Sequence, residues 1–238
     1  MANLVWRSTL INTFFQCPRL FYLKYVATPQ DDNKFDNDYL KLGRAVHKVL
    51  EEAIKGTAPV MVLYRELLEH VPESMRADFL DMYPSISDFI EQLKNRDDIH
   101  KILIEKTYYI DSIALQGTID LAILRPDGTA ELIDHKTNKS ATVTGEIKRQ
   151  LSIYGLFLTN YEKAEAVEAK VHFVRHGVVR KVYEKDATQV RQDGVSLLLD
   201  FKRELKSQIG KWEPRPSWKC RFCPFLKTCP EGQARVKV

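Results

Sequence analysis

The segment 117–136 (GTIDLAILRPDGTAELIDHK) places two acids and a lysine within an otherwise apolar pattern. Asp120 interrupts the first apolar run, and Asp134 and Lys136 stand two residues apart at the end of the second. Because side chains alternate along a strand, Asp134 and Lys136 share one face and His135 takes the other. Carboxylates buried in a sheet are costly unless they are paired or bound to a metal. The pattern therefore indicates a divalent-cation site, with a buried ion pair plus a turn aspartate as the alternative.

The segment around these residues has the pattern of a β-hairpin. Both halves are rich in β-branched residues, and the tripeptide 126–128 (Pro-Asp-Gly) joins a fixed φ angle to a residue that tolerates positive φ. We therefore expect two antiparallel strands joined by a turn. A further strand is expected over 101–110, and Glu105 within it is a third acid, which could support metal ligands or form a salt bridge and ranks below the other acids.

A histidine lies on the apolar face of a predicted helix. Apolar spacing predicts this helix over 39–54, with Gly56 as its end, and places His47 on one face with Leu50 and Ile54. Histidines on such faces are usually ordinary core residues. Beside two carboxylates, a neutral imidazole is also a sensible ligand for Mg²⁺ or Mn²⁺, and nitrogen ligation favours Mn²⁺.

Two polar side chains follow the hairpin on another helix, predicted over 142–160. Gln150 and Tyr154 are four residues apart, so they project from one helix face toward the end of the second hairpin strand. They could serve the same site as the hairpin acids. The alternative is a surface glutamine beside a half-buried tyrosine.

The four cysteines form a second group. Cys220, Cys223 and Cys229 make a C-x2-C-x5-C array, and Cys17 is the remaining cysteine, near the opposite end of the chain. Disulfides are disfavoured in the reducing compartment that we expect for this chain. Four thiolates suit either structural Zn²⁺ or an iron-sulfur cluster, and their spacing alone does not separate the two.

Taken together, these motifs resemble the PD-(D/E)XK nuclease superfamily. Asp120, followed fourteen residues later by Asp134-His135-Lys136, resembles the core motif of that superfamily. The run from Gly43 to His47 resembles the G-x-x-x-H helix of its RecB-like branch. The next motif of that branch, Q-x-x-x-Y, is matched in type and position by Gln150 and Tyr154.

The resemblance implies metal-dependent hydrolysis of DNA phosphodiester bonds, and an exonuclease above all. It assigns Mg²⁺ or Mn²⁺ to His47, Asp120, Asp134 and the backbone carbonyl of His135. The catalytic residues that it implies are Asp120, Asp134, Lys136, Gln150 and Tyr154. Lys136 would orient the attacking water and offset developing charge, and Gln150 and Tyr154 would engage the DNA backbone or support the site.

The cysteines extend the resemblance to a smaller group. One cysteine before Pro18 and three near the carboxyl end resemble the iron-sulfur nucleases typified by the AddB carboxyl-terminal domain and the CRISPR-associated Cas4 proteins. That likeness implies a [4Fe-4S] cluster held by Cys17, Cys220, Cys223 and Cys229. The cluster would join the two ends of the chain as a staple and would not be the catalyst.

The implied fold is α/β, with a restriction-endonuclease-like core in which helices flank a central mixed β-sheet. We expect one nuclease domain over 1–238, with a helical insertion at 57–100 and a cluster-binding segment at 211–230. The remaining predicted elements are a helical segment over 8–25 that breaks at Pro18 and has Ser8 as its N-cap, a mobile loop over 30–38, helix starts at Pro72 and Pro84, two strands within 165–185 around Gly177, and a helix over 186–209 capped by Asp186.

Composition and charge agree with an ordinary globular protein. The chain is 44% hydrophobic and 29% charged, with a net charge of +4, so bulk electrostatics gives only a mild indication of a polyanionic partner. No apolar run approaches the roughly 20 residues that span a bilayer, and the amino terminus is a poor signal peptide. We expect a cytoplasmic protein with no membrane contact. Basic residues near the carboxyl end could contact phosphates or form a solvated face.

Two other functions remain open from the sequence. One is a catalytically silent, nuclease-like subunit that grips DNA within a repair, recombination or CRISPR adaptation complex. The other is a zinc-binding nucleic-acid module, which would leave the hairpin acids unexplained. The resemblance implies DNA, single-stranded or with free ends, as substrate, and a helicase, a recombinase or CRISPR adaptation proteins as partners. No G-x4-G-K-[ST] phosphate loop occurs in the chain.

Overall fold

The computed structural model describes residues 4–27 and 37–236 of the 238-residue chain. The chain divides into two compact units, one from Met1–Phe35, Tyr109–Gln116 and Val195–Val238, and the other from Asp36–Tyr108 and Gly117–Gly194. We call them the terminal unit and the sheet unit. The loop expected over 30–38 lies, except for its last two positions, outside the described residues.

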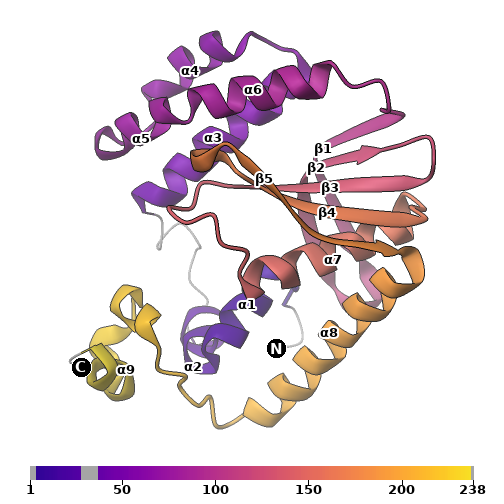
Figure 1. Cartoon of the computed structure of the whole chain (residues 1–238). Coiled ribbons are helices and arrows are strands. Elements are labelled where there is room, and N and C mark those ends of the chain that lie inside the picture. The colour runs from indigo at the N-terminus through magenta and orange to yellow at the C-terminus, as the bar shows by residue number, and fades with distance from the viewer. Residues whose placement is uncertain (1–3, 28–36, 237–238) are drawn as a thin grey trace. The chain divides into compact units, whose positions relative to one another are not determined.

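A five-stranded mixed sheet forms the centre of the sheet unit, in the order β1-β2-β3-β4-β5 (Figure 1). Neighbours β2 and β3 are antiparallel, β3 and β4 parallel, and β4 and β5 antiparallel. The parallel step needs a crossover, which α7 supplies. The bounds are β1 Lys101–Ile110, β2 Leu115–Leu124, β3 Thr129–Lys136, α7 Gly145–Tyr161, β4 Ala166–Phe173 and β5 Val178–Asp186.

The predicted hairpin is β2 and β3, and its turn forms as the sequence indicates. The amide of Gly128, at φ 82°, donates to the Arg125 carbonyl at 3.2 Å, and that of Arg125 donates to Thr129 at 2.9 Å. The Asp127 carboxylate accepts from the Thr129 amide at 2.8 Å. Glycine adopts positive φ without the steric cost that other residues pay, which is why the Pro-Asp-Gly sequence indicates this turn.

The predicted helical insertion consists of α4 (Val60–Leu68), a 3-10 turn (Glu73–Met75), α5 (Arg76–Asp81) and α6 (Tyr83–Lys94). Pro72 precedes the 3-10 turn and Pro84 lies in the first turn of α6, as expected. These helices and α3 (Asp38–Lys55) share an apolar cluster with Val46, Phe79 and Met82 at its centre. Gly56 ends α3 in the left-handed conformation at φ 75°.

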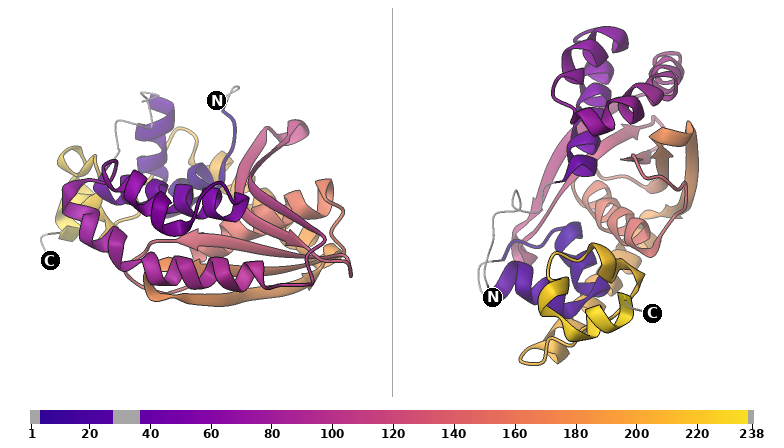
Figure 2. Two further views of the ribbon diagram at one scale, coloured as in Figure 1. Left: turned by 90° about the horizontal axis from the view of Figure 1, so that it is seen from above. Right: turned by 90° about the vertical axis from the view of Figure 1, so that its left-hand side faces the viewer.

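Helices cover both faces of the sheet (Figures 1 and 2). On one face, Phe89 of α6 stacks on the His172 ring of β4 with centroids 4.5 Å apart. On the other, a Cβ atom on Gly117 of β2 would lie 2.7 Å from Phe157 and 3.0 Å from Tyr154 of α7. Gly117 therefore allows α7 to approach the sheet closely, on the face of β3 that carries Asp134 and Lys136.

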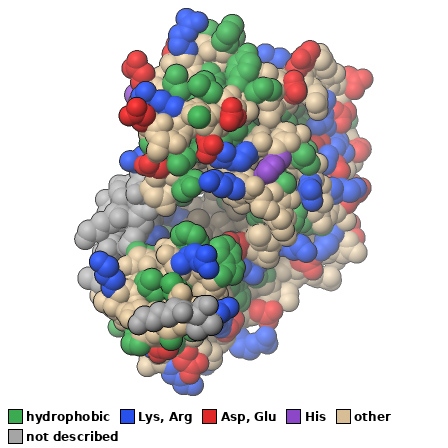
Figure 3. Space-filling model, turned by 60° about the vertical axis from the view of Figure 1, so that its left-hand side comes forward, with side chains coloured by type: hydrophobic (Ala, Val, Ile, Leu, Met, Phe, Trp, Pro, Cys, Tyr) green, Lys and Arg blue, Asp and Glu red, His purple; other side chains and the backbone are tan. Residues whose placement is uncertain are grey.

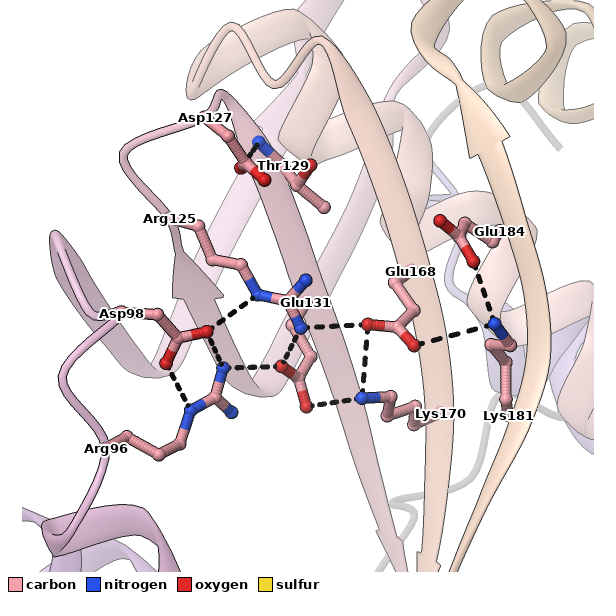
Figure 4. A network of polar contacts seen from close by, with 10 residues as sticks. All are labelled: Arg96, Asp98, Arg125, Asp127, Thr129, Glu131, Glu168, Lys170, Lys181 and Glu184. Atoms are coloured by element: carbon pink, nitrogen blue, oxygen red, sulfur yellow. Dashed lines mark hydrogen bonds and ion pairs between the residues drawn. The ribbon is translucent and has the colours of Figure 1, made fainter.

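A charged ladder crosses the end of the sheet next to the hairpin turn (Figure 4). Glu131 of β3 is 4% exposed and pairs with Arg96 at 2.9 Å, Arg125 at 2.6 Å and Lys170 at 2.9 Å. Glu168 of β4 also pairs with Arg125, at 2.9 Å. A carboxylate buried this deeply requires such partners, and they link β2, β3 and β4.

The terminal unit is built on aromatic packing. It contains α1 (Ser8–Gln16), α2 (Pro18–Phe21), a π-helical turn (Tyr22–Ala27), the end of α8 (Ala187–Gln208), two 3-10 turns (Trp218–Phe222 and Leu226–Thr228) and α9 (Pro230–Val236). Phe14 meets Phe21 and Phe201 edge to face, with centroids 5.6 and 5.3 Å apart. Among the described helices, none is long and apolar enough to cross a bilayer.

Two details of the terminal elements differ from expectation, and two agree. The predicted N-cap, Ser8, is instead the first helical residue and is only 5% exposed. The N-cap position of α1 is occupied by Arg7, whose side chain makes no capping hydrogen bond. The helical segment also continues to Ala27, past the predicted residue 25. It breaks at Pro18 as predicted, and Asp186 caps α8 by accepting from the amides of Thr188 and Gln189 at 2.8 and 2.9 Å.

Candidate active site

Three side chains from three elements meet at one end of the sheet unit. His47 comes from α3, Glu105 from β1 and Asp120 from β2. The Nδ1 atom of His47 lies 3.5 Å from Glu105 Oε1 and 3.7 Å from Asp120 Oδ1. One ligand atom from each residue falls within 4.8 Å of the others, so this trio could hold a metal ion.

The backbone of His135 in β3 completes this side of the site. Its amide donates to Asp120 Oδ2 at 2.8 Å, and its carbonyl oxygen accepts from His47 Nε2 at 3.1 Å. Since a carbonyl cannot donate, Nε2 of His47 carries the proton. In the neutral imidazole the lone pair is then on Nδ1, the atom that faces Glu105 and Asp120. Metal-binding histidines commonly donate their other ring N–H to a carbonyl in this way.

The two carboxylates set the charge of His47. Burial disfavours its protonated form, but Asp120 and Glu105 outweigh that effect and raise the pKa of His47 to about 9. Without a metal, a proton on Nδ1 therefore balances these acids near neutral pH. A divalent cation on the same carboxylates would compete with that proton.

Asp134 and Lys136 lie on the adjacent strand, on the face opposite to the His135 side chain. The register that pairs Leu121 with Ile133 sets Asp134 across from Asp120. Lys136 Nζ is 2.7 Å from Asp134 Oδ2, and Asp134 is 1% exposed. Burial raises the pKa of Asp134 to about 6, against the opposing effect of Lys136. Burial would lower the pKa of Lys136, but Asp134 and Asp120 outweigh it and the pKa is raised.

A relay of hydrogen bonds ties Lys136 to α7. Lys136 Nζ donates to Gln150 Oε1 at 3.1 Å, and Gln150 Nε2 donates to the Tyr154 hydroxyl at 2.9 Å. Tyr154 is 5% exposed, so its hydroxyl supports the site from within the protein. The structure thus brings the two predicted α7 residues to Lys136.

A family model described as the PD-(D/E)XK nuclease superfamily matches residues 8–230. The chain belongs to the PD-(D/E)XK nuclease superfamily. Membership indicates a metal-dependent nuclease with nucleic acid as its substrate, and the mixed sheet flanked by helices agrees with the restriction-endonuclease-like fold.

One solved structure with detectable similarity is titled "Crystal structure of SSO0001". It is 17% identical, the match covers 95% of this chain and 86% of that chain, and the TM-score is 0.37. No curated protein gives a significant match.

The donor atoms of this superfamily member fit a divalent cation. Asp134 Oδ2 is paired with Lys136, whereas Oδ1 has no hydrogen-bond partner among the described residues. A buried acceptor without a partner is costly, and a cation would satisfy it. Asp134 lies outside the trio of His47, Glu105 and Asp120. The oxygen and nitrogen donors suit Mg²⁺ or Mn²⁺.

Glu105 lies among the candidate metal ligands, where the sequence indicates at most a supporting residue. It stands in the left-handed region at φ 46° inside β1, where an L-residue carries strain on the order of 1–3 kcal/mol. The burial alternation of β1 is broken at this point, as at a β-bulge. The Glu105 carboxylate lies 3.5 Å from Nδ1 of His47. The only signal in the sequence was an acid within a predicted strand.

The His135 side chain belongs to the opposite face of the sheet. Its Nδ1 lies 3.0 Å from Nδ1 of His172, and Ser85 Oγ lies 3.3 Å from the other nitrogen of that ring. Burial holds the pKa of His135 well below its ordinary value and lowers that of His172 to about 4. These imidazoles are neutral and lie on the opposite face of the sheet, so the backbone carbonyl is the acceptor of His135 that lies beside His47.

A cleft of about 840 Å³ opens beside the trio. Part of its wall is polar or basic, and Lys139 Nζ lies 5.5 Å from the centre of the Tyr39 ring. The cleft is lined by Asn37, Tyr39, Leu40, Gly43, Arg44, His47, Lys48, Glu51, Glu105, Thr137, Asn138 and Lys139. A polyanionic strand entering it would reach His47 and Glu105 directly.

The four cysteines gather within the terminal unit. All four are unoxidised, half-buried and line one narrow pocket. The Arg215 amide donates to Cys17 Sγ at 3.4 Å, and the Ser217 amide to Cys220 Sγ at 3.3 Å. Burial raises the pKa of Cys223, and the other three thiols add to the shift. The donor set and its enclosure fit a thiolate-bound metal group.

Proposed function

We propose that this chain is a metal-dependent DNA exonuclease of the RecB-like branch, similar to Cas4 or to phage and repair exonucleases. The observation that carries the proposal is the convergence of His47, Glu105 and Asp120 beside the buried Asp134–Lys136 pair. Acids from two paired strands and a lysine two residues after the second acid form the arrangement that metal-assisted phosphodiester hydrolysis requires.

One or two Mg²⁺ or Mn²⁺ ions would be held by His47, Asp120, Asp134 and the His135 carbonyl, with Glu105 as an added ligand. Bound there, the metal would polarise the scissile phosphate and lower the pKa of a water molecule. Asp120 has a second task, because its Oδ2 atom fixes the His135 amide. It thereby orients the carbonyl of the same residue.

Lys136 is the charged group that we assign to the reacting phosphate. Its raised pKa keeps the ammonium protonated at neutral pH, and Gln150 holds it at 3.1 Å. A fixed ammonium can orient the attacking water and offset charge that develops on the phosphate oxygens. Tyr154 in turn orients Gln150, so both α7 residues act on the reaction through Lys136.

DNA with free ends, or single-stranded DNA, is the substrate that we propose for the cleft. Lys139 and Arg44 lie on its wall, where they can contact backbone phosphates without reading the base sequence. The likeness to Cas4 and AddB supports a helicase, a recombinase or CRISPR adaptation proteins as partners and the cytoplasm as location.

We propose a [4Fe-4S] cluster for the cysteine pocket. The support for this group is the four-thiol pocket together with the likeness of the cysteine pattern to the iron-sulfur nucleases. The cluster would join Cys17 to the segment 220–229 as a structural element of one nuclease domain.

The test is cleavage of end-labelled linear and circular DNA, single- and double-stranded, by protein purified without oxygen. We expect degradation that requires Mg²⁺ or Mn²⁺ and falls at least about 100-fold in Lys136→Ala. Lys202→Ala, an exposed lysine of α8, is the matched control and should cleave normally. Cleavage retained in Lys136→Ala would place the active site elsewhere. No cleavage by the metal-loaded wild type would make this chain a DNA-gripping subunit.

A further inference from the structure

The most exposed large hydrophobic side chains of the terminal unit lie in one short turn. Within Trp218–Phe222, Trp218 is 61% exposed and Phe222 is 73% exposed. Their rings meet edge to face, with centroids 6.2 Å apart and planes at 87°. Both rings therefore keep most of their surface in contact with solvent.

The other two tryptophans of this unit are half-buried and pack against aromatic neighbours. Trp212 stacks on Tyr22 with centroids 5.0 Å apart, and Trp6 meets Phe201 at 5.0 Å. Trp218 contacts only the likewise exposed Phe222 ring among the aromatic contacts of the described residues, and it stays 61% exposed. Leaving a tryptophan and a phenylalanine in water forgoes burial that is favourable for folding, so an external partner is the natural explanation.

The surroundings of the two rings are basic. Lys219 and Arg221 alternate with the aromatic residues, Lys227 follows, and residues 217–229 contain no acid. The nearest acid in the sequence after this segment, Glu231, is paired with Arg19 at 3.0 Å. Figure 3 shows basic and hydrophobic side chains together on the surface of this unit. The charge fits a polyanion.

The aromatic rings narrow the choice of polyanion. In a duplex the base faces are stacked on one another, and only phosphates and groove edges are accessible. Unpaired bases expose their faces, and alternating aromatic and basic side chains bind them by stacking and by charge. The turn is also preorganised, because the Ser217 side chain caps it by accepting from the Lys219 amide at 3.3 Å.

We propose that Trp218 and Phe222, flanked by Lys219 and Arg221, form a stacking platform for the unpaired bases of single-stranded nucleic acid. None of these residues belongs to the candidate active site. The platform binds the strand whether or not the chain cleaves it, so binding can be measured apart from catalysis.

The test is binding of a fluorescein-labelled, mixed-sequence 20-nucleotide DNA and of its duplex, without added divalent metal. The protein is the whole chain carrying Lys136→Ala, which keeps the DNA intact. Adding Trp218→Ala and Phe222→Ala should weaken single-strand binding roughly 10- to 100-fold and leave duplex binding nearly unchanged. Leu199→Ala, which removes another 60%-exposed side chain of the same unit, is the control and should bind normally.

Two further readouts separate stacking from a general structural effect. Trp218→Phe should keep most of the affinity but lose the quenching of tryptophan fluorescence by single-stranded DNA. Lys219→Gln with Arg221→Gln should reduce the slope of log affinity against log salt by about 1.4, which is 0.7 for each phosphate contact.

Three results would overturn the platform. One is unchanged single-strand binding in the double alanine variant. Another is a loss of duplex binding as large as the loss of single-strand binding. The third is binding of phosphatidylserine vesicles that depends on the two rings when oligonucleotide binding does not, which would make the surface a membrane contact. If the alanine variants lose their thiolate-bound metal, the decision rests on Trp218→Phe. Quenching of tryptophan fluorescence by single-stranded DNA that persists in this variant would then overturn the platform.

Discussion

Lys136 lies between an acid that keeps it charged and an amide that keeps it in place. The Asp134 carboxylate is 2.7 Å away, and Gln150 accepts from the ammonium at 3.1 Å. Without Gln150, the flexible lysine side chain would be held by charge alone, which is weakly directional. The amide therefore contributes position, which matters most as charge develops on the substrate.

We expect Gln150→Ala to lower the single-turnover rate of DNA cleavage roughly 10- to 100-fold at saturating metal. The metal concentration for half-maximal rate should not change, since Gln150 is not placed among the ligands. Tyr154→Phe should have a smaller effect, because it removes only the group that orients Gln150. Gln192→Ala on the exposed side of α8 is the control. An altered metal requirement in Gln150→Ala would contradict this role.

At the scale of elements, β3 carries two different charged centres. Its carboxyl end holds Asp134 and Lys136, and its amino end holds Glu131 among three cations. Burial would raise the pKa of Glu131, but its hydrogen bonds with three cations outweigh burial and lower the pKa. These cations are Arg96, Lys170 and Arg125. We infer that this ladder fixes the strand register on which the active site depends.

The lowered pKa of Glu131 predicts a pH-dependent contribution to stability. Because the folded-state pKa of Glu131 lies below the unfolded value of about 4.3, the unfolded chain binds the proton first as pH falls. The stabilisation is therefore complete above about pH 5 and declines as pH falls through the folded-state pKa.

Accordingly, Glu131→Gln should reduce the free energy of unfolding by about 3 kcal/mol at pH 7, with a smaller difference from wild type near pH 4. Urea unfolding at both pH values measures this. Glu184→Gln removes an exposed carboxylate of the same ladder, paired with Lys181 at 2.8 Å, and should change the free energy of unfolding far less. An equal loss at both pH values for Glu131→Gln would show that its charge is not the cause.

At the scale of the whole molecule, the cysteine pocket gathers residues from opposite ends of the chain. Cys17 follows α1, whereas Cys220, Cys223 and Cys229 lie beyond α8. Bonds from one metal group to all four would close a loop that spans nearly the entire sequence. Loop-closure entropy grows slowly with length, but thiolate–metal bonds can contribute on the order of 10 kcal/mol to folding.

We predict that Cys17→Ser or Cys220→Ser lowers both the metal content and the melting temperature, the latter on the order of 10 °C. Iron and acid-labile sulfide analysis of protein purified without oxygen measures the first, and a thermal melt the second. Thr228→Ala, in the same cysteine-rich segment, should change neither. Unchanged stability in both cysteine variants would refute a stapling role, and zinc without iron would refute the cluster.

The sequence by itself determined the local part of this protein. The period of two along β3 put Asp134 and Lys136 on one face, and the turn signal at 126–128 set the hairpin. Helical spacing placed His47 on the inner face of α3. These features follow from backbone geometry within a few residues, which is why strand and helix bounds were predicted closely. The N-cap of α1 was nevertheless predicted one residue too late.

Only the tertiary structure decided which of these groups meet. The position of β1 beside β2 brings a third acid, Glu105, to His47, and the packing of α7 against Gly117 brings Gln150 to Lys136. The neutral state of His135 likewise depends on its burial against His172. Such contacts join residues far apart in the chain, and their distances are set by how strands and helices pack, which local periodicity does not encode.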